Sequence, residues 1–229
     1  MAKDIEKEKQ LAAKEAVKLI SNNQVVGLGT GSTAVYAVME IGKLVKEGLT
    51  IKGVPTSKKT RDLALSLNIP LLDINSVSSI DITIDGADEF NEDLILIKGG
   101  GGALFTEKIV ALLTKQEIII ADSSKKVDVL GKFKLPVEVV PIAFNYVLTK
   151  LKAIGGTGKI RLVADKPFIT DQGNYIVDVD FGAITAPAPL AQALKEIEGI
   201  VGHGLFIDLT AKIIMGSDDS TITYLAKQS

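Results

Sequence analysis

The stretch Gln24-Val-Val-Gly-Leu-Gly-Thr-Gly-Ser-Thr33 decides how this chain folds, because it joins a short apolar strand to a glycine-rich loop. The residues that follow, 32–46, have the apolar spacing of a helix. Similar units recur up to Leu130, with further strands expected at 51–54, 71–74, 80–85, 94–97 and 117–121. Strands that alternate with helices indicate an α/β fold with a Rossmann-like, mostly parallel sheet flanked by helices.

The pattern changes after Leu130. Helical stretches at 142–153 and 189–197, among strands that include 159–163, 175–179 and 204–208, indicate a smaller α+β unit with a ferredoxin-like order of elements. Two strand-like pieces near the C-terminus are expected to return to the first sheet. We therefore predict a main α/β catalytic domain of residues 1–130 plus 205–229, and a small α+β domain of residues 131–204.

The composition excludes several kinds of chemistry. The 229 residues include no cysteine and one histidine, His203, to which we assign no chemistry. A thiol nucleophile, a disulfide framework and a zinc site with sulfur ligands are therefore excluded. Any catalysis must come mainly from carboxylates, lysines, hydroxyls and backbone amides.

The charge balance argues against two classes of partner. The 26 basic and 28 acidic residues give a net charge of -2 with no basic stripe, so nucleic acid is not an expected partner. No apolar run reaches the roughly 18 residues of a membrane span, and the polar start lacks the apolar core of a signal peptide. We expect no membrane association and a cytoplasmic location.

The loop Gly29-Thr-Gly-Ser-Thr33 is the first candidate binding element. Its glycines permit close backbone approach, and the free amides of the following helix suit a phosphate. Thr30, Ser32 and Thr33 add hydroxyl donors around Gly31. The loop completes neither a Walker A motif nor G-x-G-x-x-G, and a tight turn with a helix cap would explain it equally well.

Three carboxylates lie close together in Asp85-Gly-Ala-Asp-Glu89, directly after an expected strand. Such a group can bind sugar hydroxyls, transfer protons or coordinate magnesium. An ordinary Asx turn would also account for it, because Asp and Gly are common turn residues.

Four consecutive glycines follow Lys98, and Glu107 lies in the helix after them. Such a run costs backbone entropy and has no side chains to pack, so close approach of a ligand explains it better. A fourth loop, Ala121-Asp-Ser-Ser-Lys125, also follows an apolar strand. Because ligands bind at the carboxyl ends of parallel strands, the four loops are expected to form one pocket. A phosphate loop, lysines and carboxylates suit a small sugar phosphate.

These motifs resemble the type A ribose-5-phosphate isomerases. The resemblance also includes Leu130-Gly-Lys-Phe-Lys-Leu-Pro-Val-Glu-Val139, Asp171-Gln-Gly-Asn174 and Gly199-Ile-Val-Gly202, in order over nearly the whole chain. It implies interconversion of D-ribose 5-phosphate and D-ribulose 5-phosphate, in the non-oxidative pentose phosphate pathway, with no metal or organic cofactor. It also implies a homodimer or homotetramer.

The resemblance assigns roles by motif. Glu107 matches the base that moves a proton through an enediolate, Lys98 the cation near the developing oxyanion, and Asp85 a carboxylate assisting ring opening or hydroxyl proton movement. By ungapped counting, an N-terminal family lysine falls on Lys9, with Lys7 close by. The expected substrate-binding residues are Thr30, Gly31, Ser32, Thr33, Asp85, Gly86, Asp88, Lys98, Gly99, Gly100, Lys125 and Lys9.

Two other functions remain open on the sequence. A non-catalytic sugar-phosphate sensor would use the phosphate loop but would not need Glu107. An acyl-CoA transferase, related only at the level of the fold, would use Glu107 as a nucleophile. Burial would raise the pKa of Glu107, whereas a helix N-terminus and nearby lysines would lower it, and the sequence does not decide between these effects.

Overall fold

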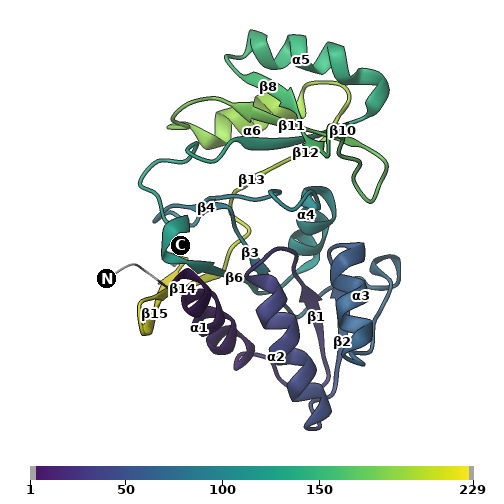
Figure 1. Cartoon of the computed structure of the whole chain (residues 1–229), viewed down its shortest axis with the longest axis vertical. Helices are drawn as coiled ribbons and strands as arrows, with labels where there is room; N and C mark the ends of the chain where they lie inside the picture. The colour runs from purple at the N-terminus through teal and green to yellow at the C-terminus, as the bar shows by residue number, and fades with distance from the viewer. Residues whose placement is uncertain (1–3, 227–229) are drawn as a thin grey trace.

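The computed structural model describes residues 4–226 and contains a six-stranded main sheet (Figure 1). Its strands lie in the order β15-β14-β6-β3-β1-β2, and every neighbouring pair is parallel except β14 with β15. The predicted mostly parallel sheet and the return of the C-terminal strands are confirmed. The strand bounds are β1 Gln24–Leu28, β2 Ile51–Pro55, β3 Ile82–Gly86, β6 Glu117–Asp122, β14 Lys212–Ser217 and β15 Ser220–Leu225.

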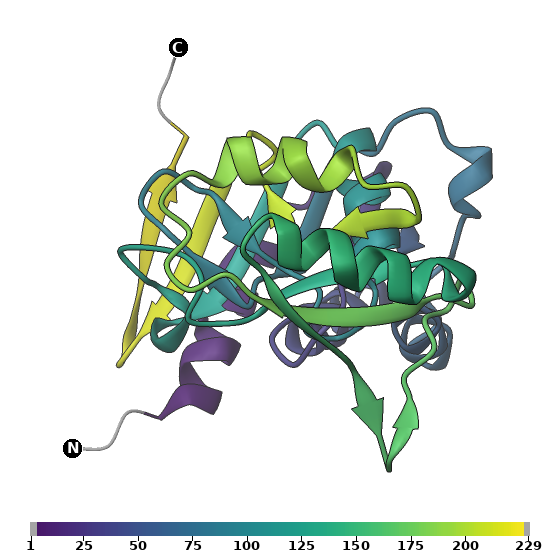
Figure 2. The ribbon, with the colours of Figure 1, turned by 90° about the horizontal axis from the view of Figure 1, so that it is seen from above.

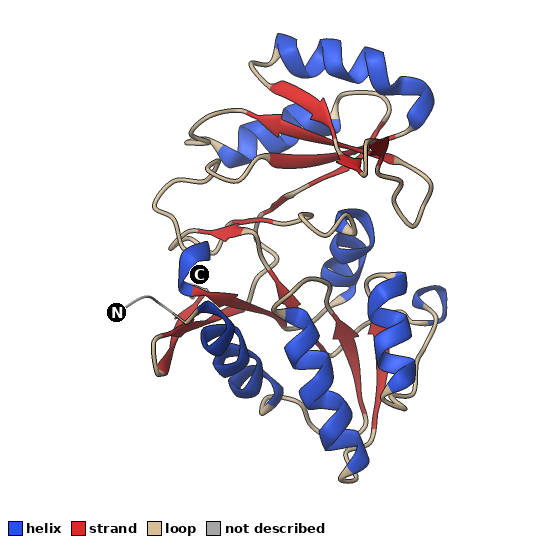
Figure 3. Cartoon of the chain, in the orientation of Figure 1, coloured by secondary structure: helices blue, strands red, loops and turns tan. Residues whose placement is uncertain are grey.

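Helices cover both faces of this sheet because its central strands are apolar on both sides. All six residues of β6 are buried. Helices α1 (Ile5–Val17), α2 (Ala34–Lys46) and α3 (Lys58–Ser66) lie on one face of this sheet (Figure 3). Ile118 and Ile120 pack in one core with these helices. Ile119 and Ala121 pack on the opposite face, in a core that includes Ala111 of α4 (Leu104–Leu113). Within residues 4–226, no helix is both long and apolar enough to span a bilayer.

A second sheet lies at the other end of the molecule, where its strands follow the order β12-β7-β11-β8 (Figure 1). All three pairings are antiparallel. With two helices between the strands in sequence, this is the ferredoxin-like arrangement. The bounds are β7 Leu135–Val139, α5 Phe144–Ala153, β8 Thr157–Ile160, β11 Tyr175–Asp180, α6 Pro187–Lys195 and β12 Ile200–His203.

The strand predicted at 204–208 is present only as Leu205–Phe206, and its assignment to the small α+β unit is wrong, because the chain changes sheets at Gly204. Residues Ile200–His203 form β12 of the second sheet, whereas β13 (Leu205–Phe206) pairs with β5 (Leu96–Ile97) in a small sheet with β4 (Glu89–Phe90). The Gly204 N–H donates to the Pro136 carbonyl at 2.8 Å, and the Gly204 carbonyl accepts from the Lys98 N–H at 2.9 Å. Gly204 therefore connects β7 of the second sheet to Lys98, the residue directly after β5.

Three further differences concern local structure. The strand predicted at 71–74 is replaced by one isolated bridge, Gly53 with Leu71, and a 3-10 helix η1 (Ile74–Ser76). The strand predicted at 159–163 ends at Ile160, and the chain continues into a projecting hairpin of β9 (Leu162–Val163) and β10 (Lys166–Pro167) (Figure 2). Short 3-10 helices η2 (Ser123–Lys125) and η3 (Pro141–Ala143) follow β6 and β7.

The division into domains at residues 131 and 204 stays a prediction. Two sheets in one chain are compatible with it, but they do not by themselves establish two folding units. Residues 1–3 and 227–229 of the predicted main domain lie outside the described residues.

The central position of β6 leads to a stability prediction. Replacement of fully buried Ile120 by alanine should lower the free energy of unfolding by about 2–5 kcal/mol, because it leaves a cavity in the core. The same replacement at Ile222, which is 43% exposed on β15, should change it by less than about 1 kcal/mol. Urea unfolding at fixed pH measures both values, and equal losses at the two positions would contradict the assignment of the core.

Candidate active site

Residues from all four predicted loops line one cleft at the carboxyl edge of the main sheet. The space between its protein atoms is about 390 Å³, part of it open to solvent. Of the predicted site residues, only Asp85 and Lys9 are missing from the lining; Ala87 and Gly101 join it. The full lining is Thr30, Gly31, Ser32, Thr33, Gly86, Ala87, Asp88, Lys98, Gly99, Gly100, Gly101, Glu107 and Lys125.

Asp85 lies beneath the cleft near the end of β3 and links the loop of residues 29–33 to the sheet. Its Oδ1 accepts hydrogen bonds from the backbone N–H groups of Thr30 at 2.9 Å and Gly86 at 2.7 Å. The approach is so close that a Cβ on Gly29 would lie 2.2 Å from this oxygen. Only glycine can occupy that position without moving the carboxylate.

The side chain of Thr30 belongs to a cluster of hydroxyl groups. Its Oγ1 lies 2.7 Å from Thr56 Oγ1, 2.8 Å from Ser57 Oγ and 3.1 Å from Thr60 Oγ1. These three residues follow the end of β2 and hold the phosphate loop from its outer side. None of the three was predicted from the sequence, although Thr56 and Ser57 follow the strand predicted at 51–54 by one and two residues beyond Pro55.

The Lys98 ammonium occupies the centre of the buried network. The side chain is 1% exposed, with Nζ 2.9 Å from Asp85 Oδ2 and 3.1 Å from Glu107 Oε1. Nζ also donates to the Gly86 carbonyl. Burial alone would lower the pKa of Lys98, but the negative charges of Asp85, Glu107 and Glu117 outweigh it and raise the pKa above its ordinary value. Lys98 therefore stays a cation.

Glu107, in the first turn of α4, is 5% exposed. Burial raises its pKa to about 8, although contact with Lys98 acts in the opposite direction. Oε1 contacts Lys98, and among the described residues no group hydrogen-bonds to Oε2. The carboxylate can therefore exchange a proton near neutral pH through an oxygen that the protein leaves uncommitted.

Asp88 connects the carboxylate loop to the glycine run. Its Oδ2 accepts a hydrogen bond from the Gly100 N–H at 2.7 Å. Burial raises the pKa of Asp88, and this amide and the positive charges of Lys98, Lys125 and Arg161 partly oppose the rise. The side chain lines the cleft beside Lys98 and Lys125.

A second buried acid, Glu117, begins β6 and was not singled out from the sequence. It is 2% exposed, and neither of its side-chain oxygens has a hydrogen bond among residues 4–226. Burial raises its pKa well above the ordinary value. Its register partner is Thr83 on β3, two residues before Asp85, which places Glu117 below the network rather than in the cleft.

Two predicted participants lie elsewhere. Lys9 does not line the cleft, and its Nζ contacts Glu6 Oε1 at 2.6 Å. Glu89 turns away from Asp85 and Asp88 and accepts from the backbone N–H groups of Gly131, at 2.8 Å, and Phe133. Within the described part of the chain, no three His, Cys, Asp or Glu side chains are grouped closely enough to hold a metal ion. The three carboxylates of residues 85–89 do not converge on one point.

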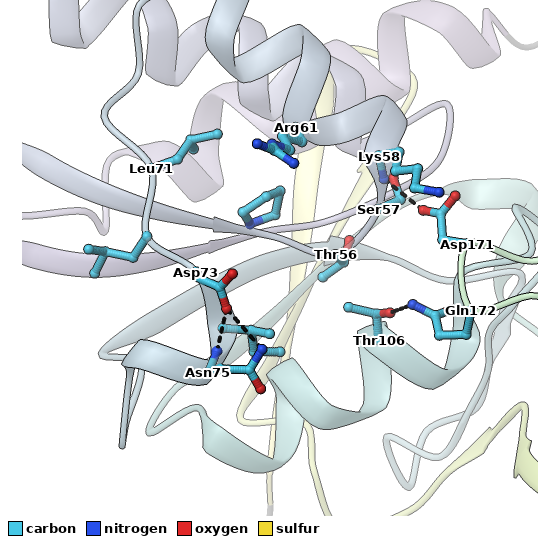
Figure 4. A pocket seen from close by; sticks show the side chains of 13 residues that line it. Thr56, Ser57, Lys58, Arg61, Leu71, Asp73, Asn75, Thr106, Asp171 and Gln172 are labelled. Atoms are coloured by element: carbon cyan, nitrogen blue, oxygen red, sulfur yellow. Dashed lines mark hydrogen bonds between the residues drawn. The ribbon is translucent and has the colours of Figure 1, made fainter.

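A larger hollow, with about 920 Å³ between its protein atoms and part of it open to solvent, is lined by Thr56 and Thr106 (Figure 4). Gln172 Nε2 donates to Thr106 Oγ1 at 2.9 Å, and Asp171 Oδ2 accepts from the Lys58 N–H at 2.7 Å. The hollow contains neither the glycine loops nor the Lys98 network. The smaller cleft is therefore the better candidate for catalysis, despite its size.

A buried lysine–glutamate pair at the edge of a glycine-rich cleft can transfer a proton within a small ligand, so the fold and the site define the class as an enzyme of proton transfer. Residues 52–220 match the family model described as ribose 5-phosphate isomerase A (phosphoriboisomerase A). The chain belongs to this family, whose members are aldose–ketose isomerases.

Curated relatives and solved structures agree with the family assignment. Ribose-5-phosphate isomerase A of Sphingopyxis alaskensis is 48% identical over 212 residues and that of Bacillus mycoides 45% over 217, covering 93% and 94% of this chain and 93% and 98% of theirs. A D-ribose-5-phosphate isomerase solved with phospho-erythronic acid has a TM-score of 0.94 at 37% identity, covering 97% of this chain and 99% of its own. The enzyme of Methanocaldococcus jannaschii has a TM-score of 0.90 at 41% identity, with coverage of 95% and 97%.

Proposed function

We propose that Glu107 is the base in the interconversion of D-ribose 5-phosphate and D-ribulose 5-phosphate. The observation that carries this proposal is the state of its carboxylate, which is buried, has a pKa raised to about 8, and has no hydrogen bond to Oε2 from any residue between 4 and 226. In the forward direction, Oε2 takes the proton from C2 of the open-chain aldehyde. The C2–H electron pair forms an enediolate, and the protonated carboxyl then returns the proton to C1, while the O2 hydroxyl proton moves to O1.

Lys98 supplies the positive charge that this step requires. A proton next to a carbonyl is only weakly acidic, so the enediolate must be stabilised electrostatically. The ammonium lies 3.1 Å from Glu107 and cannot readily leave, because Asp85 and the Gly86 carbonyl hold it. The role in ring opening predicted for Asp85 stays a prediction, since its carboxylate lies beneath the cleft.

The substrate phosphate is proposed to bind at residues 31–33, which line the cleft directly before the N-terminus of α2 and include the hydroxyl groups of Ser32 and Thr33. Asp88 and Lys125 line the same cleft and are proposed to bind sugar hydroxyls. A solved relative was determined in complex with phospho-erythronic acid, which supports a cleft for a phosphorylated polyhydroxy anion. That ligand combines a phosphate, hydroxyls and a planar anionic group, as the enediolate does. Lys9 stays a predicted contact without a place in the cleft.

A sugar-phosphate sensor is the alternative that shares this cleft. It would not require a buried carboxylate with an oxygen left uncommitted beside a fixed ammonium. The family assignment and this geometry both favour the enzyme.

We also propose that the protein is a homodimer or homotetramer that works in the cytoplasm. Apolar side chains exposed around the second sheet support self-association, among them Ile142, Leu162, Val163 and Ile169. Sedimentation equilibrium should give the mass of two or four chains. A mass of one chain at micromolar concentration would contradict the proposal.

Replacement of Glu107 by glutamine should reduce turnover of ribose 5-phosphate by at least about 10²–10⁴-fold, because the amide cannot accept the proton. Binding of phospho-erythronic acid should survive, because the loops that bind it are unchanged. The matched control is Glu198→Gln, an exposed position whose replacement should leave turnover unaltered. Steady-state kinetics and calorimetry give both quantities. Near-native turnover by the Glu107 variant would remove its assignment as the base, and a wild-type protein that binds but never isomerises would favour the sensor.

The raised pKa of Glu107 sets the expected pH dependence. The base works in its ionised form, so kcat/KM should rise as pH increases and level off above a pKa of about 8. Lys98 does not titrate in this range, because its pKa is raised above the ordinary value. Initial rates between pH 5 and 9, at constant ionic strength, measure the limb. An acidic limb at pH 4 to 5, the range of an ordinary glutamate, would show that burial does not dominate.

A further inference from the structure

Arg161 contacts the glycine loop of the candidate site from the second sheet. It lies between β8 and β9, and its Nη1 donates to the Gly99 carbonyl at 2.9 Å and the Gly100 carbonyl at 3.0 Å. Nε donates to Asp178 Oδ2 at 2.9 Å, and Nη2 binds the other oxygen of this carboxylate. The planar guanidinium is therefore oriented by a two-point contact on β11 and uses its remaining edge on the loop.

The loop has few means of holding its own conformation. Gly99 has a φ of +105°, which side chains of other residues rarely allow, and neither Gly99 nor Gly100 has a side chain to anchor it. Within the loop, the Gly102 N–H donates to the Gly99 carbonyl at 2.9 Å. The other contacts come from outside: Asp88 accepts from the Gly100 N–H, and Arg161 binds the two carbonyls.

The direction of these carbonyls matters for an anionic ligand. Gly99 and Gly100 line the cleft, but Arg161 does not. The carbonyl oxygens that it binds are therefore directed out of the cleft, toward the second sheet. If these peptide groups turned over, their oxygens would present partial negative charge to the phosphate or to the enediolate, which would weaken binding of both.

We propose that Arg161, oriented by Asp178, is a positioning residue that fixes the peptide groups of Gly99 and Gly100 for binding of the sugar phosphate and its enediolate. The proposal rests on the proposed function of the cleft and extends it to a residue outside the lining. The contacts of Arg161 also link β11 of the second sheet to the glycine loop. The test must therefore separate an effect on the loop from an effect on the stability of the protein.

The principal variant is Arg161→Ala, with Lys166→Ala as control. Lys166 is an exposed cation on β10 of the adjoining hairpin, and its removal changes the net charge equally. Arg161→Ala should lower kcat/KM by about 10-fold or more, as expected for loss of hydrogen bonds from a charged group. Binding of phospho-erythronic acid should weaken by a similar factor, whereas Lys166→Ala should remain within about twofold of the wild type.

Chemical rescue separates positioning from stability. Guanidinium chloride at low millimolar concentration should restore part of the activity of Arg161→Ala, because the free ion can occupy the vacated space, and equal sodium chloride should not. Thermal unfolding is followed in parallel. A loss of activity that only tracks the unfolded fraction, or wild-type kcat and KM in Arg161→Ala, would overturn the proposal.

Two further variants cover the case in which Arg161→Ala does not fold. Arg161→Lys keeps the charge but cannot span two carbonyls and Asp178, and Asp178→Asn keeps the guanidinium but loosens its orientation. Both should fold and lose part of kcat/KM, and wild-type kinetics in both would overturn the proposal. Glu107→Gln, assayed beside them, tests the base independently: if it stays active, the assignment of the base fails while the effect of Arg161 is still measured against the wild type.

Discussion

A lysine ammonium without access to water is the constraint on which the rest of the site depends. Lys98 can keep its charge only if other groups replace its hydration, and here two carboxylates and a backbone carbonyl do so. These partners come from β3 and from α4, while Lys98 itself follows β5. The three elements must therefore meet within hydrogen-bonding distance. The glycines around them follow from the same requirement, because a Cβ on Gly29 would collide with Asp85.

Charge balance around Lys98 also distinguishes two buried glutamates. Burial raises the pKa of both Glu107 and Glu117. Only Glu107 contacts the ammonium, and only Glu107 lines the cleft. Glu117 has neither a hydrogen bond nor an opening to the ligand among the described residues, so it is best satisfied as a neutral acid. Glu107 thus has a position from which it can reach a ligand, whereas Glu117 is part of the protein interior.

Segments that connect strands of the second sheet contact three parts of the chain on or next to the site. Arg161 holds the glycine loop, Gln172 binds Thr106 beside Glu107, and Asp171 accepts from the first amide of α3. The helix α4 has no side-chain cap of its own, and it packs against β7 and β12 of the second sheet. The second sheet and its connecting segments carry no proposed catalytic residue, but they restrain the glycine loop and helix α4, which contains Glu107.

The motifs found in the sequence were local, and those that came together did so for a simple reason. In the main sheet the parallel strands β1, β3 and β6 end at the same edge, so the loops after them share a cleft. The strand expected at 94–97 is not part of this sheet: β5 pairs antiparallel with β4 and β13, and its glycine loop reaches the cleft through contacts with Asp85 and Asp88. Errors arose where structure depends on distant partners. The apolar pair Leu71 and Leu72 forms only a bridge, since Pro70 and Asp73 interrupt the strand pairing, and Gly204 divides one apolar run between two sheets. Lys9 is one helical turn from Glu6 and forms an ion pair with it. Counting residues along the family motif could not show that the side chain is engaged there instead of in the cleft.

The sequence by itself determined the class of fold, the four loops and the absence of thiol chemistry, because each follows from residue types and short-range spacing. The tertiary structure alone decided the state of Glu107, because burial and Lys98 act on its pKa in opposite directions and their balance depends on geometry. It also decided which side chains hold the loops. Arg161 is 62 residues from Gly99 in the chain, and no local pattern connects them; only the fold brings a guanidinium to two glycine carbonyls.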